Sequence, residues 1–178
     1  MPLFVFLVAV RIGAAFPDAW SRLSPSYVVA VEAGATVWRE RLALVVDGAF
    51  SAPSAAAGGS DAALGAYRAR LDAREVVLGV SLVYRHPLGR VVPYVGAGPR
   101  LCVFDAHGGG TAAMGATLPA ESELSVGGGG GLVGLGVRLG PGEAFVDLRA
   151  DAAPVHNHLS GDIVAGAVFV SGGYRLTF

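Results

Sequence analysis

Apolar residues alternate with small, polar or charged residues along most of this chain, and the period of the alternation is two residues. Stretches 28–37 and 42–50 show the pattern clearly, with Val, Leu, Ala and Phe recurring between the other residues. A period of two is typical of a β-strand whose two faces meet different surroundings, whereas a helix repeats about every 3.6 residues. No segment carries a convincing helical repeat with capping residues. The pattern therefore predicts an all-β protein.

Eight segments have this pattern, and the connections between them alternate in length. In an up-and-down antiparallel sheet, such alternation places every long loop at one end and both termini at the other. The predicted strands cover 3–16, 26–38, 41–52, 70–85, 90–105, 122–139, 143–153 and 163–178. The short connections are Arg39-Glu40, 86–89 and 140–142, and the long ones are 17–25, 53–69, 106–121 and 154–162.

Residues 1–10 resemble the apolar core of a signal peptide. No basic residue precedes them, however, and Arg11 ends the stretch without a small-residue cleavage site. Discarding the first segment would also leave seven strands and an open sheet edge. We therefore expect an export signal to be gone already, and residues 1–178 to form a single domain that begins with a strand.

The two faces of the predicted strands differ in polarity. One face is almost wholly apolar, with residues such as Val8, Leu44 and Leu78. The opposite face carries charges of both signs but no Lys, because all 13 basic residues of the chain are Arg. We expect this charged face to form one network, whose members are Arg11, Glu32, Asp47, Glu75, Tyr94, Arg100, Arg138, Asp147, Arg149 and Arg175.

The apolar face points inward in a soluble ligand-binding barrel and outward in a membrane barrel, and three features favour the membrane barrel. Each apolar face is about 9–11 residues long, the length of a tilted strand that crosses hydrocarbon. The charged face lacks Lys, which suits a crowded interior where guanidinium groups pair with carboxylates. Aromatic residues gather at both ends of the apolar face, with Phe4, Tyr84 and Phe178 at one end and Phe16, Tyr27 and Phe50 at the other.

Composition agrees with a membrane barrel rather than with membrane helices. Hydrophobic residues make up 53% of the chain and charged residues only 15%, yet no stretch offers the roughly 18 continuous apolar residues of a spanning helix. A sheet in lipid must close on itself, because lipid cannot bond an open strand edge. The predicted fold is an eight-stranded, antiparallel, up-and-down transmembrane β-barrel. Pro99 lies within a predicted strand and should mark a bulge or a locally broken ladder.

Two stretches of the chain carry a resemblance to a known family. They are Gly-Tyr-Arg-Leu-Thr-Phe at 173–178 and Pro-Tyr-Val-Gly-Ala-Gly at 93–98. With them the chain resembles the small outer-membrane β-barrels of Gram-negative bacteria, similar to the transmembrane domain of outer-membrane protein A. The resemblance implies insertion in the outer membrane among lipid and lipopolysaccharide, with short periplasmic turns and long extracellular loops. It also implies recognition of Tyr174, Leu176 and Phe178 by the barrel-assembly machinery.

The resemblance does not imply one function, because this fold carries several. A structural, surface-binding or envelope-assembly role with a plugged lumen is our first expectation, possible envelope protein partners included. A narrow gated channel for small solutes or ions is the second. His158 and Ser160 are similar to the His-x-Ser pair of outer-membrane lipid A deacylases, but the strand that follows offers no acid to orient the histidine. We expect no cofactor and no metal site. We also expect no nucleic-acid partner, because the net charge is −1 and the arginines are scattered along the chain.

Overall fold

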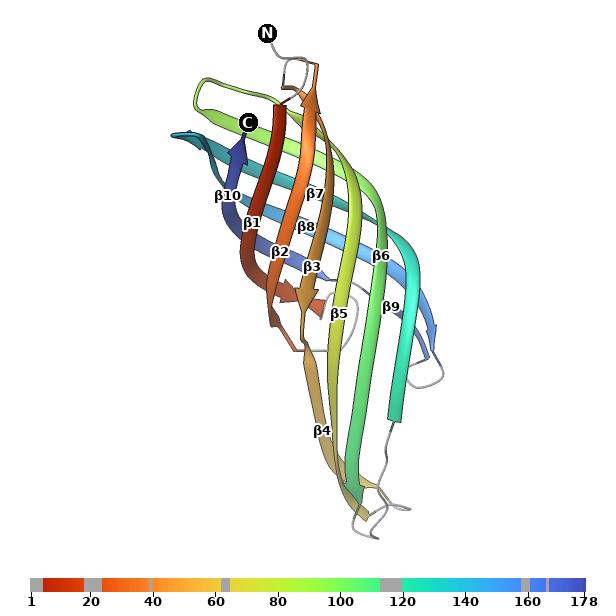
Figure 1. The fold of residues 1–178 in the computed structure, drawn as a ribbon. Coiled ribbons are helices and arrows are strands. Elements are labelled where there is room, and N and C mark those ends of the chain that lie inside the picture. The colour runs from red at the N-terminus through yellow and green to blue at the C-terminus, as the bar shows by residue number, and fades with distance from the viewer. Residues whose placement is uncertain are drawn as a thin grey trace.

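The computed structural model describes residues 5–17, 24–38, 40–61, 65–112, 120–157, 161–165 and 167–178. Over these residues the chain is almost entirely β-structure (Figure 1). None of the described segments is a helix long and apolar enough to cross a membrane. The strands are β1 (Val5–Phe16), β2 (Ser26–Val37), β3 (Leu42–Ser51), β4 (Ser54–Asp61), β5 (Gly65–Arg85), β6 (Val91–Ala112), β7 (Ala120–Leu139), β8 (Gly142–Asn157), β9 (Gly161–Ala165) and β10 (Val168–Thr177).

Eight of these strands form a closed antiparallel barrel. They follow one another in the order β10-β1-β2-β3-β5-β6-β7-β8, and β8 pairs with β10 to close the ring. Both chain ends lie at the same end of the barrel (Figure 1). The predicted eight-stranded barrel is thus confirmed. The apolar N-terminal segment is indeed a strand, because β1 pairs with β10 on one side and with β2 on the other.

The predicted long loops 53–69 and 106–121 are wrong, because the described parts of both are largely β-strand. β4 pairs with the first residues of β5, from Ser54↔Asp72 to Asp61↔Gly65. β5 and β6 have 21 and 22 residues and continue far past the barrel (Figure 1). We call residues 54–61, 65–74, 105–112 and 120–123 the arm. In the last predicted loop, β8 likewise continues to Asn157 and pairs with β9.

The ladder between β5 and β6 is interrupted at Pro99, as the sequence predicted. Pairing runs to Gly79↔Arg100 and resumes at Leu82↔Ala97. Proline has no N–H to donate, and a side chain supplies donors at the gap instead. Arg100 Nη1 donates to the carbonyl oxygens of Val80, at 3.4 Å, and Pro99, at 3.1 Å.

The barrel is apolar outside and charged inside. Val8, Leu44 and Leu78 expose 47%, 54% and 48% of their surface, so these side chains do not pack centrally as a soluble barrel would require. Exposed apolar residues of this kind occur on every strand of the ring and form a belt around it. The belt includes Phe6, Val10, Ile12, Phe16, Tyr27, Val29, Val31, Val46, Phe50, Val76, Val80, Leu82, Tyr84, Val95, Leu101, Val133, Leu135, Val146, Leu148, Val170, Leu176 and Phe178.

Candidate functional site: the charged lumen

The lumen near the short-turn end is filled by a chain of alternating charges. Arg85 Nη2 donates to Glu143 Oε2 at 2.5 Å, and Arg175 Nη1 donates to Glu143 Oε1 at 2.8 Å. Arg175 also donates from Nε to Glu32 Oε1 at 2.7 Å. These side chains come from β5, β8, β10 and β2. Inward-pointing positions of four strands therefore meet at the barrel axis.

The chain of charges continues through Arg11, which lies in the middle of β1. Its Nη2 donates to Asp47 Oδ2 at 3.0 Å, and its Nη1 lies 3.7 Å from Glu32 Oε2 and 3.5 Å from Asp147 Oδ2. Arg149 also bonds to Asp47 through Nη1. Every one of these five residues is buried. Charges withdrawn from water in this way are tolerated only when they are paired.

A second cluster joins β5, β6 and β8. Arg100 Nε donates to Asp151 Oδ1 at 2.8 Å, and Arg100 Nη2 donates to Ser81 Oγ at 2.9 Å. On the long-loop side, Ser51 Oγ donates to Glu75 Oε2 at 3.3 Å. Arg100 therefore both pairs with a buried carboxylate and bonds to the carbonyls at the gap in the ladder.

Aromatic rings and glycines complete the packing of the lumen. The Arg175 guanidinium carbon lies 5.2 Å from the Tyr94 ring centroid and 4.6 Å from the Phe145 ring centroid, within cation–π range. The Tyr94 ring occupies the space that a side chain at Gly134 would need, and the Glu143 carboxylate does the same at Gly136. Glycines on β7 therefore make room for large side chains from other strands.

The structure places nine of the ten predicted network residues in the buried interior and leaves Arg138 out. Arg138 has the inward phase of β7, but it lies at the short-turn rim. Its side chain is 45% exposed, and Nη2 bonds to Glu40 Oε2 at 2.7 Å. The sequence prediction was wrong for this residue because phase gives the face of a strand and not the height along it.

Sequence analysis missed three charged members of the lumen, namely Arg85, Glu143 and Asp151. Arg85 and Glu143 lie at strand ends, where the alternation was not followed. Both have the same phase as predicted members of their strands, because Arg85 lies a whole number of two-residue steps from Glu75, and Glu143 from Asp147. Extending the period-two count to the ends of the strands would have found all three.

The described residues leave a small void beside the charges and a larger pocket at the rim. A void of about 10 Å³ lies among Glu32, Tyr94, Asp147 and Arg175, which is room for about one water molecule. A pocket of about 160 Å³ opens at the short-turn rim beneath the Glu40–Arg138 pair. A buried apolar cluster lies between these charges and Glu75; it comprises Ala15, Val28, Ala30, Ala49, Val77, Cys102, Ala153, Ala167 and Phe169.

The other sequence candidates are not brought together into a site by the described residues. His158 and Ser160 lie outside them, as does Phe4 of the predicted aromatic girdle. Asp151, an acid that precedes this pair in the sequence, is buried against Arg100. Among the described residues no group of three or more His, Cys, Asp or Glu side chains could hold a metal ion. Of the C-terminal residues, Tyr174, Leu176 and Phe178 face outward on the belt.

A closed β-barrel with an apolar outer belt and a charged, filled interior defines the chain as an integral β-barrel membrane protein. Barrel closure leaves no backbone edge for lipid to meet. The belt gives the outer surface the polarity of hydrocarbon, and the charges are sequestered in the lumen.

Comparisons with solved structures give the same class. The chain is similar to Neisserial surface protein A, with a TM-score of 0.63, 19% identity, and coverage of 98% of this chain and 97% of that one. It is also similar to a major outer membrane protein from Thermus thermophilus, with a TM-score of 0.60, 17% identity, and coverage of 97% of this chain and 99% of that one. The N-terminal β-barrel domain of Pseudomonas aeruginosa OprF is similar with a TM-score of 0.56, 10% identity, and coverage of 97% of each chain. No family model and no curated protein sequence matches the chain.

These likenesses establish the fold, which is that of the small outer-membrane β-barrels. The fold resemblance stated from the sequence is therefore confirmed. Together, the fold, the apolar belt and the charged interior identify the chain as an integral protein of the outer membrane.

Proposed function

We propose that this protein is a closed, non-catalytic outer-membrane barrel that holds its arm rigidly outside the membrane. In this proposal the lumen is a plug, and the arm presents a surface to molecules outside the cell. The observation that carries the proposal is the continuous set of buried ion pairs from Arg85 to Arg149. The void beside Glu32, Arg85 and Arg175 in this set measures only about 10 Å³.

The plug is supported by two layers that would both have to rearrange before a solute could pass. The charged layer is tied across the lumen by Arg11 and Arg175, which each pair with carboxylates from two or more strands. Beside it lies the apolar cluster with Val77 and Phe169, and Phe169 pairs in register with Arg149. An ion that passed this cluster would lose hydration against apolar side chains, which is costly.

Conductance in planar bilayers tests the plug against a gated channel. The purified protein should give no regular current steps. Arg138→Gln opens the exposed rim pair with Glu40 without touching the buried charges, and this variant should also be silent. Regular steps in the unaltered protein that grow in Arg138→Gln would instead establish a gated channel and overturn the plug.

The same proposal includes the partners expected of such a barrel. Lipid and lipopolysaccharide would surround the belt, envelope proteins are possible partners of the arm, and the barrel-assembly machinery would insert the chain. Tyr174, Leu176 and Phe178 support the last of these, because the end of β10 presents their side chains on the outer face. The sequence 1–178 would act as a single barrel domain.

A further inference from the structure

Three arginines and one aspartate, Asp72, share the outer face of the arm directly beyond the apolar belt. Arg68, Arg70 and Arg74 are exposed and share one face of β5. The same face continues into the barrel as Val76 and Leu78, which belong to the lipid-facing belt. The row is therefore on the membrane-facing outside of the molecule and not in the lumen.

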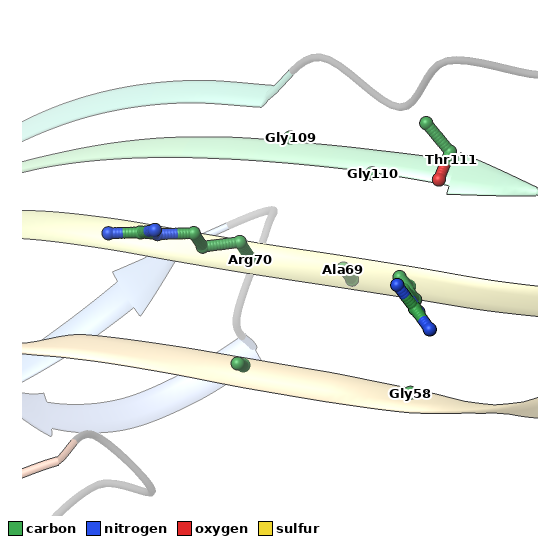
Figure 2. A pocket seen from close by; sticks show the side chains of 8 residues that line it. Gly58, Ala69, Arg70, Gly109, Gly110 and Thr111 are labelled. Carbon is green, nitrogen blue, oxygen red and sulfur yellow. The ribbon is translucent and has the colours of Figure 1, made fainter.

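A shallow pocket of about 530 Å³ surrounds two of these arginines (Figure 2). Its lining takes residues from β4, β5 and β6 and includes Arg68 and Arg70 but no carboxylate. Gly58 on β4 and Gly109 on β6 flank the arginines in register, as Gly58↔Arg68 and Arg70↔Gly109. A side chain at Gly109 would meet no atom within 4 Å, so the space beside Arg70 is open.

Among the side chains that the structure describes, the guanidinium groups of the row have one exposed ionic partner, Asp72. Arg70 Nε donates to Asp72 Oδ1 at 3.0 Å, but both side chains are mostly exposed, and an exposed pair of this kind contributes only about 0–1 kcal/mol. Arg68 and Arg74 make no ion pair with any residue whose side chain the structure describes. Asp105, which pairs in register with Arg74, bonds to His107 at 3.2 Å instead.

The height of the row above the belt decides which anion can reach it. Arg70 lies six residues beyond Val76, which is about 20 Å along a strand and about 15 Å above the belt for a tilt near 40°. The headgroup layer of a simple phospholipid is only about 5–8 Å thick. A phosphate carried on a headgroup of several sugars extends far enough to reach Arg70 and Arg68. Phosphate, like carboxylate, is an anion whose geometry the guanidinium fork matches.

The geometry points to the Arg68–Arg70 pocket as a binding site for the phosphorylated saccharide headgroup of a glycolipid in the outer leaflet. Arg74 lies nearest the belt and takes the phosphate closest to the acyl chains. The acyl chains lie on the belt, where a groove of about 570 Å³ runs past Tyr27, Val29 and Phe50. This site rests on the membrane placement in the proposed function but not on a closed lumen.

Binding of a rough-type lipopolysaccharide with phosphorylated core sugars, measured by native mass spectrometry on the protein in a neutral detergent, tests the site. We expect Arg68→Gln/Arg70→Gln to weaken binding at least tenfold. The matched control is Arg41→Gln/Arg90→Gln, which removes two exposed arginines at the short-turn end and should leave binding unchanged. Gly109→Leu should weaken binding by filling the pocket, whereas Gly129→Leu, at an equally open glycine on β7, should not.

The source of the phosphate is separated by the ligand used. Enzymatically dephosphorylated lipopolysaccharide should bind the unaltered protein and Arg68→Gln/Arg70→Gln equally, and millimolar inorganic phosphate should not compete. Equal binding of phosphorylated lipopolysaccharide to all variants, or competition by free phosphate, would overturn the site. Vesicle flotation of every variant reports the membrane placement separately: failure of the unaltered protein to float would overturn the proposed function itself.

Discussion

The barrel and the arm are parts of the same strands, yet their two faces have opposite polarity. On β5 within the barrel, Val76 and Leu78 face outward while Glu75 and Ser81 face the lumen. On β5 within the arm, Arg70 and Arg74 are on the outward face. On the opposite face, where the arm joins the barrel, lies a small apolar cluster of Ala73 and Phe104, with Ala55 and Leu71 packed against it.

The inversion occurs between Arg74 and Val76, one step along the outer face of β5. The simplest physical reading is that the surroundings change there from hydrocarbon to water. A face that meets hydrocarbon must be apolar, whereas a face that meets water can carry arginine at little cost. The level of the membrane boundary can therefore be read from where the alternation changes sign.

The largest effect should come from unpairing a charge inside the barrel. Arg149→Leu leaves Asp47 with one partner fewer, and Glu32→Leu does the same to Arg11 and Arg175. Removing one partner of a buried pair costs about 3–5 kcal/mol. Heat-dependent mobility on gels and urea unfolding from vesicles should both show lower stability. The double variant Arg100→Leu/Asp151→Leu should lose less than its two single variants added together, and stability equal to that of the unaltered protein in all of them would exclude the network.

A charge placed on the outer face should have a smaller effect that depends on which side of the boundary it lies. Val80→Arg places a guanidinium at the middle of the belt on β5 and should cost about 2–4 kcal/mol of unfolding free energy. Ala56→Arg places the same group on the outer face of the arm and should cost close to nothing. Urea titration in vesicles compares the two, and an equal cost would mean that the belt does not end at Val76.

The smallest effect on the whole molecule should come from the apolar cluster of the arm. Phe104→Ala removes its largest buried side chain and should lower the free energy of local unfolding of the arm by about 3 kcal/mol. Because the barrel ladder lies mainly below this residue, the arm should become sensitive to protease while the heat resistance of the barrel is retained. Hydrogen exchange resolved along β5 and β6 measures both. If the variant lost both the stability of the barrel and the exchange protection of the arm, the two regions would form one cooperative unit.

The sequence was sufficient for the barrel because the barrel uses large side chains with a constant phase. The alternation of Val, Leu and Phe with Arg, Glu and Asp predicted the strands, the orientation of their faces and most of the lumen residues. The arm escaped prediction because its strands are built from Ala, Gly and Ser, as in β4, which alternate weakly. Arg138 was misplaced because rim and interior share a phase, and contacts such as Arg175 with Tyr94 depend on barrel closure, which no local pattern encodes.

The arginine at the Pro99 gap links two seams of the barrel wall. Arg100 reaches Val80 on the strand before it while it is held by Asp151, which lies two strands further around the ring. The bond between Arg100 and Asp151 can form only after β8 has joined the barrel. The bonds that Arg100 makes at the gap between β5 and β6 thus depend on the placement of β8. Replacement of Asp151 should therefore disturb the barrel wall first at Pro99.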